Sequence, residues 1–481
     1  MANLLATLVN SATTLSAYDQ VLQVTQNNVA NASTPGYARQ TQTLEAMPFD
    51  PTRGDAGGVR AGTALSSRDE YAEQAVRQQN VLLGAATQSV NSLTSLQSYF
   101  DVSGSSGIPY ALNNLLQAFS AWGQTPNDAN ARQNVINQAS DLAGAFQDAA
   151  NGLTTVTQDT DQQLQQTTAQ INSLVGQLQQ FNKDVMGGDH NDSGLDAQVH
   201  STLEQLSQYV NFTATKQPDG TVNIMLNGQT PLLIEDRQYQ IACNMVQAPD
   251  AVYANAPPLA QITASDGTDI TAGITTGQLG ALLTMRNSML PGYIGDGAQQ
   301  GDLNAMAQQF ADRVNQLLTS GNISDGPPAQ TGVALFTYDA ANPTNVAGSL
   351  AINPAISASQ LAAIDPGPPE VSNGIALTLS GLANPTDSAD EIQGESFTAF
   401  YGDMASRVGN ALSEATDQQQ VQQSAVAQAQ NLRQQASGVD LDQEAMTLVQ
   451  FQQAYEANSR LISVLDQLTA DVINILSTVT G

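Results

Sequence analysis

The sequence has one cysteine, only fourteen basic residues and no long apolar run. A single cysteine excludes an internal disulfide framework and any multi-cysteine zinc site. Cys243 lies in the apolar run 239–246, which predicts a strand that holds a buried structural thiol rather than a nucleophile. No apolar stretch approaches the roughly 18 residues that a membrane span requires, so we predict no membrane partner.

The scarcity of basic residues further limits the classes of partner that the chain can bind. Forty-four acidic residues against fourteen basic ones give a net charge of −30. That charge repels phosphate backbones and anionic lipids, so no nucleic acid partner is predicted. The carboxylates are typical of a solvated surface. The first basic residue is Arg39, so the positively charged start of a secretory signal is missing. We expect the chain either to stay in the cytosol or to be exported without cleavage of a leader.

Motifs for catalysis are also missing. The chain has no Gly-x-Ser-x-Gly elbow, Walker loop, dinucleotide fingerprint or His-Glu-x-x-His helix. The best material for a metal site is a segment with two histidines and three aspartates: Asp189, His190, Asp192, Asp196 and His200. Its acids suit the capping of a following helix better. We predict no enzyme, no cofactor and no metal, although a pair of carboxylates for glycoside cleavage is set by the fold and stays open.

Both ends of the chain carry long helical patterns. Near the N-terminus Leu8, Leu15, Leu22 and Val29 recur every seven residues, with partly polar positions between them. From Leu441 to Leu476 apolar residues keep steps of three or four, which predicts one apolar stripe along a helix of about 40 residues and about 60 Å. Such a helix is too long for the interior of one compact domain and needs partners outside itself.

We therefore predict an assembly seam on the two terminal helices. Because the seams are rather polar, pairing one helix of each kind competes poorly with about 1–2 kcal/mol of backbone ordering per residue. Our hypothesis is that the termini become ordered only when neighbouring subunits supply apolar surface. The predicted seam residues are Leu8, Leu15, Leu22, Val29, Leu448, Phe451, Tyr455, Ile462, Leu465, Leu468, Val472 and Leu476.

The interior alternates between helical and strand-like patterns. Helical blocks are predicted over 68–100, 112–181, 276–320 and 397–435. Turn residues at Pro218-Asp-Gly220 and Asn227-Gly228 predict two consecutive hairpins, and strand-like, proline-rich sequence resumes over 325–390.

The predicted fold is mainly α with an inserted β-rich module. It forms an elongated multi-domain rod with terminal coiled-coil helices and a helical bundle. The predicted parts are a terminal helical domain (1–60 and 441–481), a helical bundle (61–200, 277–325 and 395–440) and a β-rich outer module (201–276 and 326–394).

Two local motifs, one near each end, resemble a known pair of signatures. The segment 27–40 resembles the N-terminal signature of the axial proteins of the bacterial flagellum, through Asn28, Asn31, Thr34, Pro35, Gly36, Tyr37 and Gln40. The segment 437–460 resembles their C-terminal signature, through Gly438, Glu444, Gln453, Ala454, Tyr455 and Asn458. Pro35 disfavours a helix at Thr34, so the first motif also predicts a helix stop.

The interior resembles one branch of these proteins, the hook-associated proteins of the first kind. The resemblance rests on 277–286 with Leu290 and Pro291, on 335–338, 351–354 and 372–377, and on the helix after Phe397. It departs at Leu318, where the family tends to have a histidine, and in the apparent lack of an additional outer domain. The resemblance implies a non-enzymatic structural subunit at the junction between hook and filament. The terminal helices would form the inner tube, and the β module would face outward.

The resemblance also implies a location and partners. It implies a secreted protein of the extracellular flagellum that leaves by type III export without a cleaved signal. The partners would be copies of itself in a ring, the hook protein, hook-associated protein three, and an export chaperone that holds the C-terminal helix over 448–476. Two alternatives stay open, which are another axial protein (hook or distal rod) and a secreted adhesin or coat protein.

Overall fold

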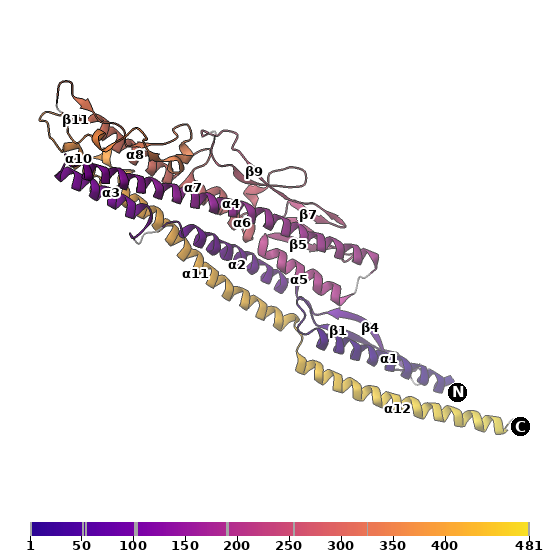
Figure 1. Cartoon of the computed structure of the whole chain (residues 1–481). Helices are drawn as coiled ribbons and strands as arrows, with labels where there is room; N and C mark the ends of the chain where they lie inside the picture. Colours follow the sequence, from indigo (N-terminus) through magenta and orange to yellow (C-terminus); the bar gives the residue numbers. More distant parts are fainter. Residues whose placement is uncertain are drawn as a thin grey trace.

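The computed structural model describes residues 2–50, 52, 55–100, 104–188, 192–253, 255–324 and 326–479. The molecule is elongated, and both termini lie together at one end, beyond the long helices of the body (Figure 1). Long helices dominate and the sheets are small, so the predicted fold class, mainly α with an inserted β module, is confirmed. None of the described helices combines the length and apolarity that crossing a bilayer requires.

The terminal part consists of two long helices and a β-hairpin. Helix α1 (Ala2–Asn31) packs along α12 (Leu441–Val479). Strand β1 (Gln40–Ala46) pairs antiparallel with β4 (Val59–Ser66), and the short β2 (Phe49–Asp50) pairs with β3 (Asp55–Ala56). The hairpin lies on α1, since Asn10 Nδ2 donates to the Gly57 carbonyl at 2.8 Å.

The body is built on four long helices: α2 (Glu70–Gln97), α3 (Gly107–Gln124), α4 (Ala129–Gly187) and α11 (Phe397–Ser437). Asp69 and Asp128 cap α2 and α4 by accepting backbone N–H groups of the first turn. The block predicted as 112–181 is split into α3 and α4, because Pro126 and the Asp128 cap end one helix and begin the next.

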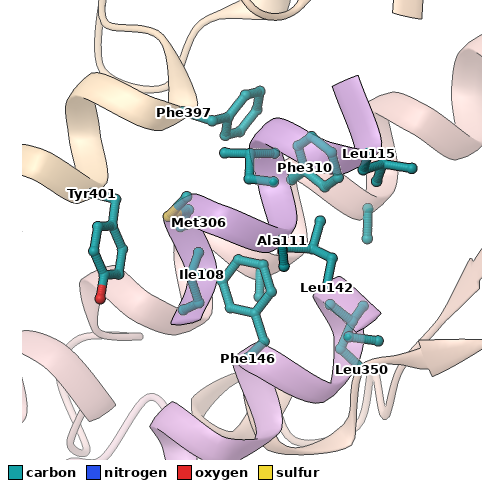
Figure 2. Packing of buried hydrophobic residues seen from close by; sticks show 14 of the residues in the cluster. Ile108, Ala111, Leu115, Leu142, Phe146, Met306, Phe310, Leu350, Phe397 and Tyr401 are labelled. Carbon is teal, nitrogen blue, oxygen red and sulfur yellow. The ribbon is translucent and has the colours of Figure 1, made fainter. Parts of the chain in front are cut away.

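Two hydrophobic cores follow one another along α4. The first core gathers α3, the first half of α4, α8 (Asp302–Ser320) and the start of α11, with Phe146, Phe310 and Phe397 among its residues (Figure 2). The second core gathers the rest of α4 with α5 (Ser193–Tyr209), α6 (Gly277–Thr284) and the sheet of the β module. Helix α4 therefore belongs to both.

The two predicted hairpins are present. Strands β5 (Phe212–Lys216), β6 (Val222–Leu226), β7 (Thr230–Ile234) and β8 (Arg237–Gln238) form an antiparallel sheet in that order. Asn227 and Gly228 both have positive φ, as a tight two-residue turn requires. Strand β9 (Ala242–Val246) pairs separately with β10 (Leu259–Thr263).

The helix predicted over 276–320 is interrupted. After α6 comes one π-helical turn, η2 (Met285–Met289), then α7 (Leu290–Ile294), and α8 starts only at Asp302. Gly295 and Gly301 both have positive φ, which is incompatible with a continuous helix.

The prediction of a β-rich segment over 326–394 is wrong for its secondary structure. Its strands β12 (Gln330–Thr331), β13 (Phe336–Thr337) and β14 (Ala351–Ile352) have two residues each, and β11 (Asn322–Ser324) precedes it. The rest is loop, with α9 (Val346–Ser349), α10 (Gly374–Gly381) and the 3-10 turns η3 (Pro343–Asn345), η4 (Ala358–Gln360) and η5 (Ser388–Asp390); a further turn, η1 (Thr271–Gly273), lies earlier. Frequent prolines break the strands, and the buried residues join the first core rather than that of β5 to β8.

Candidate assembly site

The N-terminal motif forms the turn between α1 and β1. Helix α1 ends at Asn31, as the motif predicts, and Thr34 Oγ1 donates to Asn31 Oδ1 at 3.1 Å. Gly36 has a φ of +74°, and a Cβ there would lie 2.3 Å from the Ala197 carbonyl oxygen. Only glycine fits this position, because both the backbone angle and the contact with α5 exclude a side chain.

Asn28 and Glu444 join the two motifs. Both side chains are buried, and Asn28 Nδ2 donates to Glu444 Oε2 at 3.1 Å across 416 residues of chain. Arg39 Nε donates to the other carboxylate oxygen at 2.6 Å. Asn28 Oδ1 in turn accepts from the Gln40 backbone N–H and from Tyr37 Oη, both at 2.9 Å. Burial, with the Glu444 charge adding to it, raises the pKa of Tyr37 and keeps this donor protonated.

The other C-terminal motif residues are spread over two helices. Gly438 caps the end of α11, where its N–H donates to the Gln434 carbonyl at 2.9 Å. Asn458 Nδ2 donates to the Ser11 carbonyl at 2.7 Å, which is a second polar bond between α12 and α1. Ala454 and Tyr455 are half-buried, whereas Gln453 and the N-terminal Pro35 are exposed.

The predicted seam on α1 flanks the buried row instead of forming it. Leu8, Leu15 and Leu22 are half-buried and Val29 is 43% exposed. The buried row consists of Ser11, Thr14, Ala17, Val21, Thr25 and Asn28. The contact therefore runs through small and polar residues, which an apolar periodicity does not reveal.

The predicted seam on α12 is only partly covered. Leu448, Phe451, Tyr455 and Ile462 are half-buried, with Phe451 meeting Tyr18 edge-on at a ring distance of 5.6 Å. Leu465 is buried, Leu468 and Val472 are exposed, and the side chain of Leu476 lies outside the described residues. Further apolar side chains of α12 are exposed: Leu441, Met446, Val449, Leu461, Val464, Ile473 and Ile475. The expected single stripe is thus a broad apolar surface of which α1 covers one side.

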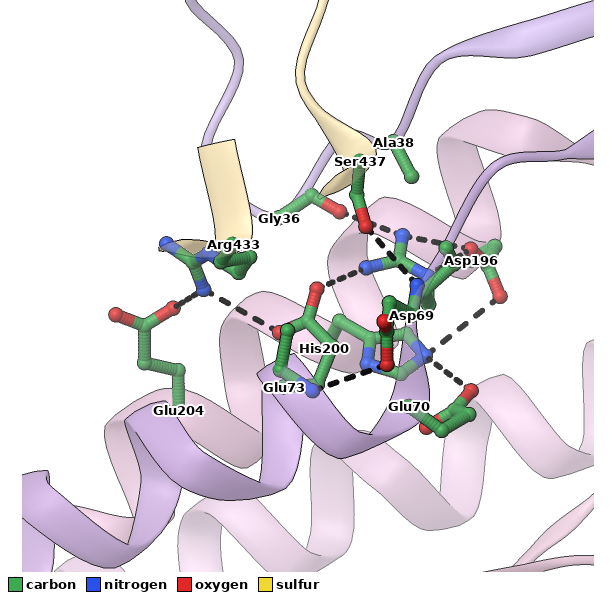
Figure 3. A network of polar contacts seen from close by, with 12 residues as sticks. Gly36, Ala38, Asp69, Glu70, Glu73, Asp196, His200, Glu204, Arg433 and Ser437 are labelled. Atoms are coloured by element: carbon green, nitrogen blue, oxygen red, sulfur yellow. Dashed lines mark hydrogen bonds and ion pairs between the residues drawn. The ribbon is translucent and has the colours of Figure 1, made fainter. Parts of the chain in front are cut away.

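A polar joint connects the terminal part to the body (Figure 3). Its centre is the buried Arg68, whose guanidinium donates to Glu73 at 2.6 Å, to Asp196 at 2.7 Å and to the Gly36 carbonyl at 2.7 Å. The three acceptors belong to α2, α5 and the motif turn. One arginine therefore fixes the motif turn against two helices of the body.

The joint extends to the end of α11. Arg433 pairs with Glu204 at 2.6 Å and with Glu73 at 3.3 Å. Four residues later Ser437 accepts the Asp69 backbone N–H through its hydroxyl and the Arg39 N–H through its carbonyl, both at 2.9 Å. The connection between α11 and α12 is thereby tied to the start of α2.

His200 and Asp196 lie next to each other at the joint. His200 Nε2 lies 3.8 Å from both Asp196 Oδ1 and Glu70 Oε1, and Asp196 is already bound by Arg68. Burial, with the Arg68 charge next, lowers the pKa of His200 to about 3, so the ring is neutral. Asp192 caps α5 as predicted. Asp189 and His190 lie outside the described residues, and among the described residues no cluster of histidine, cysteine and carboxylate groups is suited to hold a metal.

The surroundings of Cys243 and Leu318 indicate a structural role for each residue. Cys243 lies in β9, close to the predicted strand, but it is half-buried rather than buried. Burial, with the Asp161 charge adding to it, raises its pKa to about 11, so the thiol is not a nucleophile at neutral pH. Leu318 is fully buried in the first core, as an apolar replacement for a histidine can be.

The joint was missed by sequence reasoning. Glu73, Glu204 and Arg433 lie in three different helices with ordinary helical sequences, and Arg68 lies just before α2. The scarcity of basic residues was the one usable signal. In so acidic a chain, most arginines are expected to form an ion pair with a definite carboxylate.

Comparisons with known proteins agree with the motifs. The model of the flagellar hook-associated protein FlgK helical domain matches residues 93–336, which is half of the chain. The model of the flagellar basal body rod FlgEFG protein C-terminal region matches residues 430–475.

Individual relatives extend the similarity over the whole length. Flagellar hook-associated protein 1 of Bacillus subtilis is 27% identical, with 96% of each chain covered. Its counterpart in Escherichia coli is 22% identical and covers 98% of this chain and 100% of its own. The structure of the flagellar hook junction protein FlgK from Burkholderia pseudomallei has a similar fold, with a TM-score of 0.62 at 16% identity over 74% of this chain and 99% of that chain.

Proposed function

The chain belongs to the flagellar hook-associated protein FlgK family and is a structural subunit of the bacterial flagellum at the junction of hook and filament, and we propose that it assembles there through α1 and α12. The observation that carries this proposal is the apolar surface of α12, of which α1 covers one side only. Exposed apolar patches of this extent mark interaction sites.

The joint supports the same proposal. Arg68 and Arg433 hold the motif turn and the α11–α12 connection on the body, so a force applied to the terminal helices reaches the bundle. A subunit that links two larger assemblies needs such a connection. The work of the chain is then mechanical, and catalysis is not part of it.

The individual binding partners are proposed from family membership. We propose that copies of the chain form a ring between hook protein and hook-associated protein three. An export chaperone holds the exposed side of α12 before secretion, which proceeds without a cleaved signal to an extracellular position. The breadth of the apolar surface allows both uses at different times.

Complementation tests the assembly role. In a host that lacks the gene, the whole chain should restore filaments, whereas a chain without residues 441–481 should leave hooks without filaments and release flagellin into the medium. Val464→Asp sharpens the test, because Val464 is 55% exposed. Its replacement should leave the folded monomer intact. We expect this variant to be exported and to fail in assembly.

Gln467→Asp is the matched control. It adds the same charge one turn away at an exposed polar position and should restore filaments. Filaments that persist without residues 441–481, or that fail equally with both aspartate variants, would contradict assembly through the apolar side of α12.

A hook or distal rod role is the alternative that fits one of the family matches equally well. The match over 430–475 is to a C-terminal region of rod and hook-type proteins, so that end alone does not discriminate. The deletion phenotype does, because loss of a hook or distal rod protein removes the hook itself.

A further inference from the structure

The outer edge of β5 is open. The strand is the first of the sheet β5-β6-β7-β8, and among the described residues its one neighbouring strand is β6. The Gln217 N–H donates to the Thr221 carbonyl at 2.8 Å and closes the hairpin. Because backbone bonding alternates along antiparallel strands, Thr215 and Thr213 then exchange bonds with β6.

The backbone groups of the alternate residues of β5 face the open edge of the sheet. Phe212, Ala214 and Lys216 direct their backbone N–H and C=O groups away from β6. Within the described part of the chain nothing bonds to these groups. A row of unpaired backbone groups is a template for another strand.

A groove lies along this edge. It has a volume of about 670 Å³, within the roughly 300–1,000 Å³ of sites that enclose a ligand. One wall is the segment 211–216, and the other is the face of α2 that carries Glu70, Gln74, Arg77, Gln78, Val81 and Leu82. The groove is therefore long in the strand direction and mixed in polarity.

Arg77 gives the groove an unused charge. Its Nη1 is buried without a hydrogen-bond partner, and in the described part of the chain Arg77 forms no ion pair. The nearby Glu73 is engaged by Arg68 and Arg433. Glu70, Glu73 and Glu204 are close enough to act on the Arg77 charge, but none of the three forms an ion pair with it, so Nη1 is left for a further acceptor.

A second cavity continues the site inward. It has a volume of about 60 Å³ and shares Glu70, Arg77, Ala214 and Lys216 with the groove. On its wall lies His200, which is 5% exposed and whose Nδ1 has no partner. Lys216 Nζ reaches Asp196 only at 3.4 Å. Several polar groups with unused capacity thus surround one end of the groove.

We propose that the edge of β5 receives an extended segment of a partner protein as an added strand, with a carboxylate of that segment paired to Arg77. Backbone bonds to Ala214 and Lys216 provide the affinity, and the charge selects an acidic sequence. This site is separate from α1 and α12, and it does not depend on their assembly.

Peptide binding tests the proposal. The probe is the fluorescein-labelled peptide Thr-Val-Glu-Val-Thr-Val, blocked at its C-terminus, and binding to the full chain is followed by anisotropy. Ala214→Pro removes an outward N–H without removing a bond to β6, so the hairpin remains while docking is lost. We expect binding by the unchanged chain, and a Kd more than tenfold higher for this variant.

Arg77→Gln is the second variant and leaves the strand untouched. Loss of one charge-assisted bond should raise the Kd about tenfold or more, and a peptide with Gln in place of Glu should bind the unchanged chain equally weakly. Arg237→Gln, at the exposed opposite edge of the sheet, is the matched control and should bind normally.

Three results would overturn the proposal. The first is no binding to the unchanged chain, and the second is equal binding by all variants. The third is self-association of the unchanged chain in sedimentation that Ala214→Pro abolishes, because the edge would then be an interface between copies. Far-UV circular dichroism confirms that Ala214→Pro has folded, and Arg77→Gln decides the matter if it has not.

Discussion

The body and the terminal pair are both helical, but their contacts differ in kind. In the first core large side chains such as Trp122, Phe119 and Phe146 are almost completely buried by the chain itself. Between α1 and α12 the buried row is mostly small or polar, and large apolar residues remain exposed. Helix content alone therefore says little about where the folding free energy lies.

The difference teaches what each region is for. A body that is complete by itself serves as a rigid element. A terminal pair held by polar bonds such as Asn28–Glu444 and Asn458–Ser11 has a defined geometry but little apolar stabilisation. It is suited to gain its stability from neighbours, as we propose.

The largest expected effect separates the two regions directly. Phe146→Ala should lower the free energy of unfolding by about 3–5 kcal/mol, because it leaves a cavity in the first core. Phe451→Ala, at the half-buried contact with Tyr18, should cost less than about 1 kcal/mol in the dilute monomer. Urea unfolding followed by circular dichroism measures both, and equal losses would contradict the comparison.

A smaller effect is expected where the terminal pair depends on one buried carboxylate. Glu444→Ala leaves the Arg39 guanidinium without its carboxylate and removes one of the two acceptors of Asn28 Nδ2, so it should cost about 2–3 kcal/mol of local stability. Amide hydrogen exchange should become faster throughout α1 and the first half of α12, while α4 stays unchanged. Glu456→Ala, an exposed change on the same helix, serves as control.

The joint also makes the stability of the body depend on pH. Because the pKa of His200 is lowered to about 3, the folded protein keeps the ring neutral while the unfolded chain takes up a proton below about 6.5. Stability is unaffected above that pH and falls as the pH drops toward 3, by up to about 1.4 kcal/mol per unit. Between pH 6.5 and 5, the free energy of unfolding of His200→Gln, measured with urea, should fall by about 2 kcal/mol less than that of the unchanged chain. Parallel pH profiles of the two proteins would show that His200 is not the cause.

The smallest effect tests whether surface charge holds the terminal hairpin. Arg60 and Glu45 pair at 2.6 Å with both side chains more than half exposed. Arg60→Gln should change the unfolding free energy by less than about 0.5 kcal/mol. A larger loss would mean that exposed ion pairs, and not only the buried Glu444, stabilise the terminal part.

Sequence reasoning succeeded where local chemistry decides the structure. The helices α2, α11 and α12 lie close to their predicted blocks, and the Asn227-Gly228 turn forms because those residues favour positive φ. It failed over 326–394, where apolar residues separated by prolines serve as core-filling loops rather than strands. Composition alone does not distinguish these two uses.

The candidate site was predicted in part. Motif residues such as Asn28 and Glu444 were identified from the resemblance, but their direct bond spans the length of the chain and has no local signal. The predicted seam on α1 consists mainly of leucines, which flank the buried row. The prediction missed that row because its residues are mostly small or polar. Whether the seam residues drive assembly remains a prediction, and Val464→Asp tests the exposed apolar surface of α12 beside them.

The bond between Asn28 and Glu444 also sets an order in time. Synthesis runs from the N-terminus at about 5–20 residues per second, and 416 residues separate the two partners. Helix α1 therefore waits about 20–80 seconds on the ribosome before its own α12 exists. The body can fold during that interval, so the part of the chain made first is among the last to be completed.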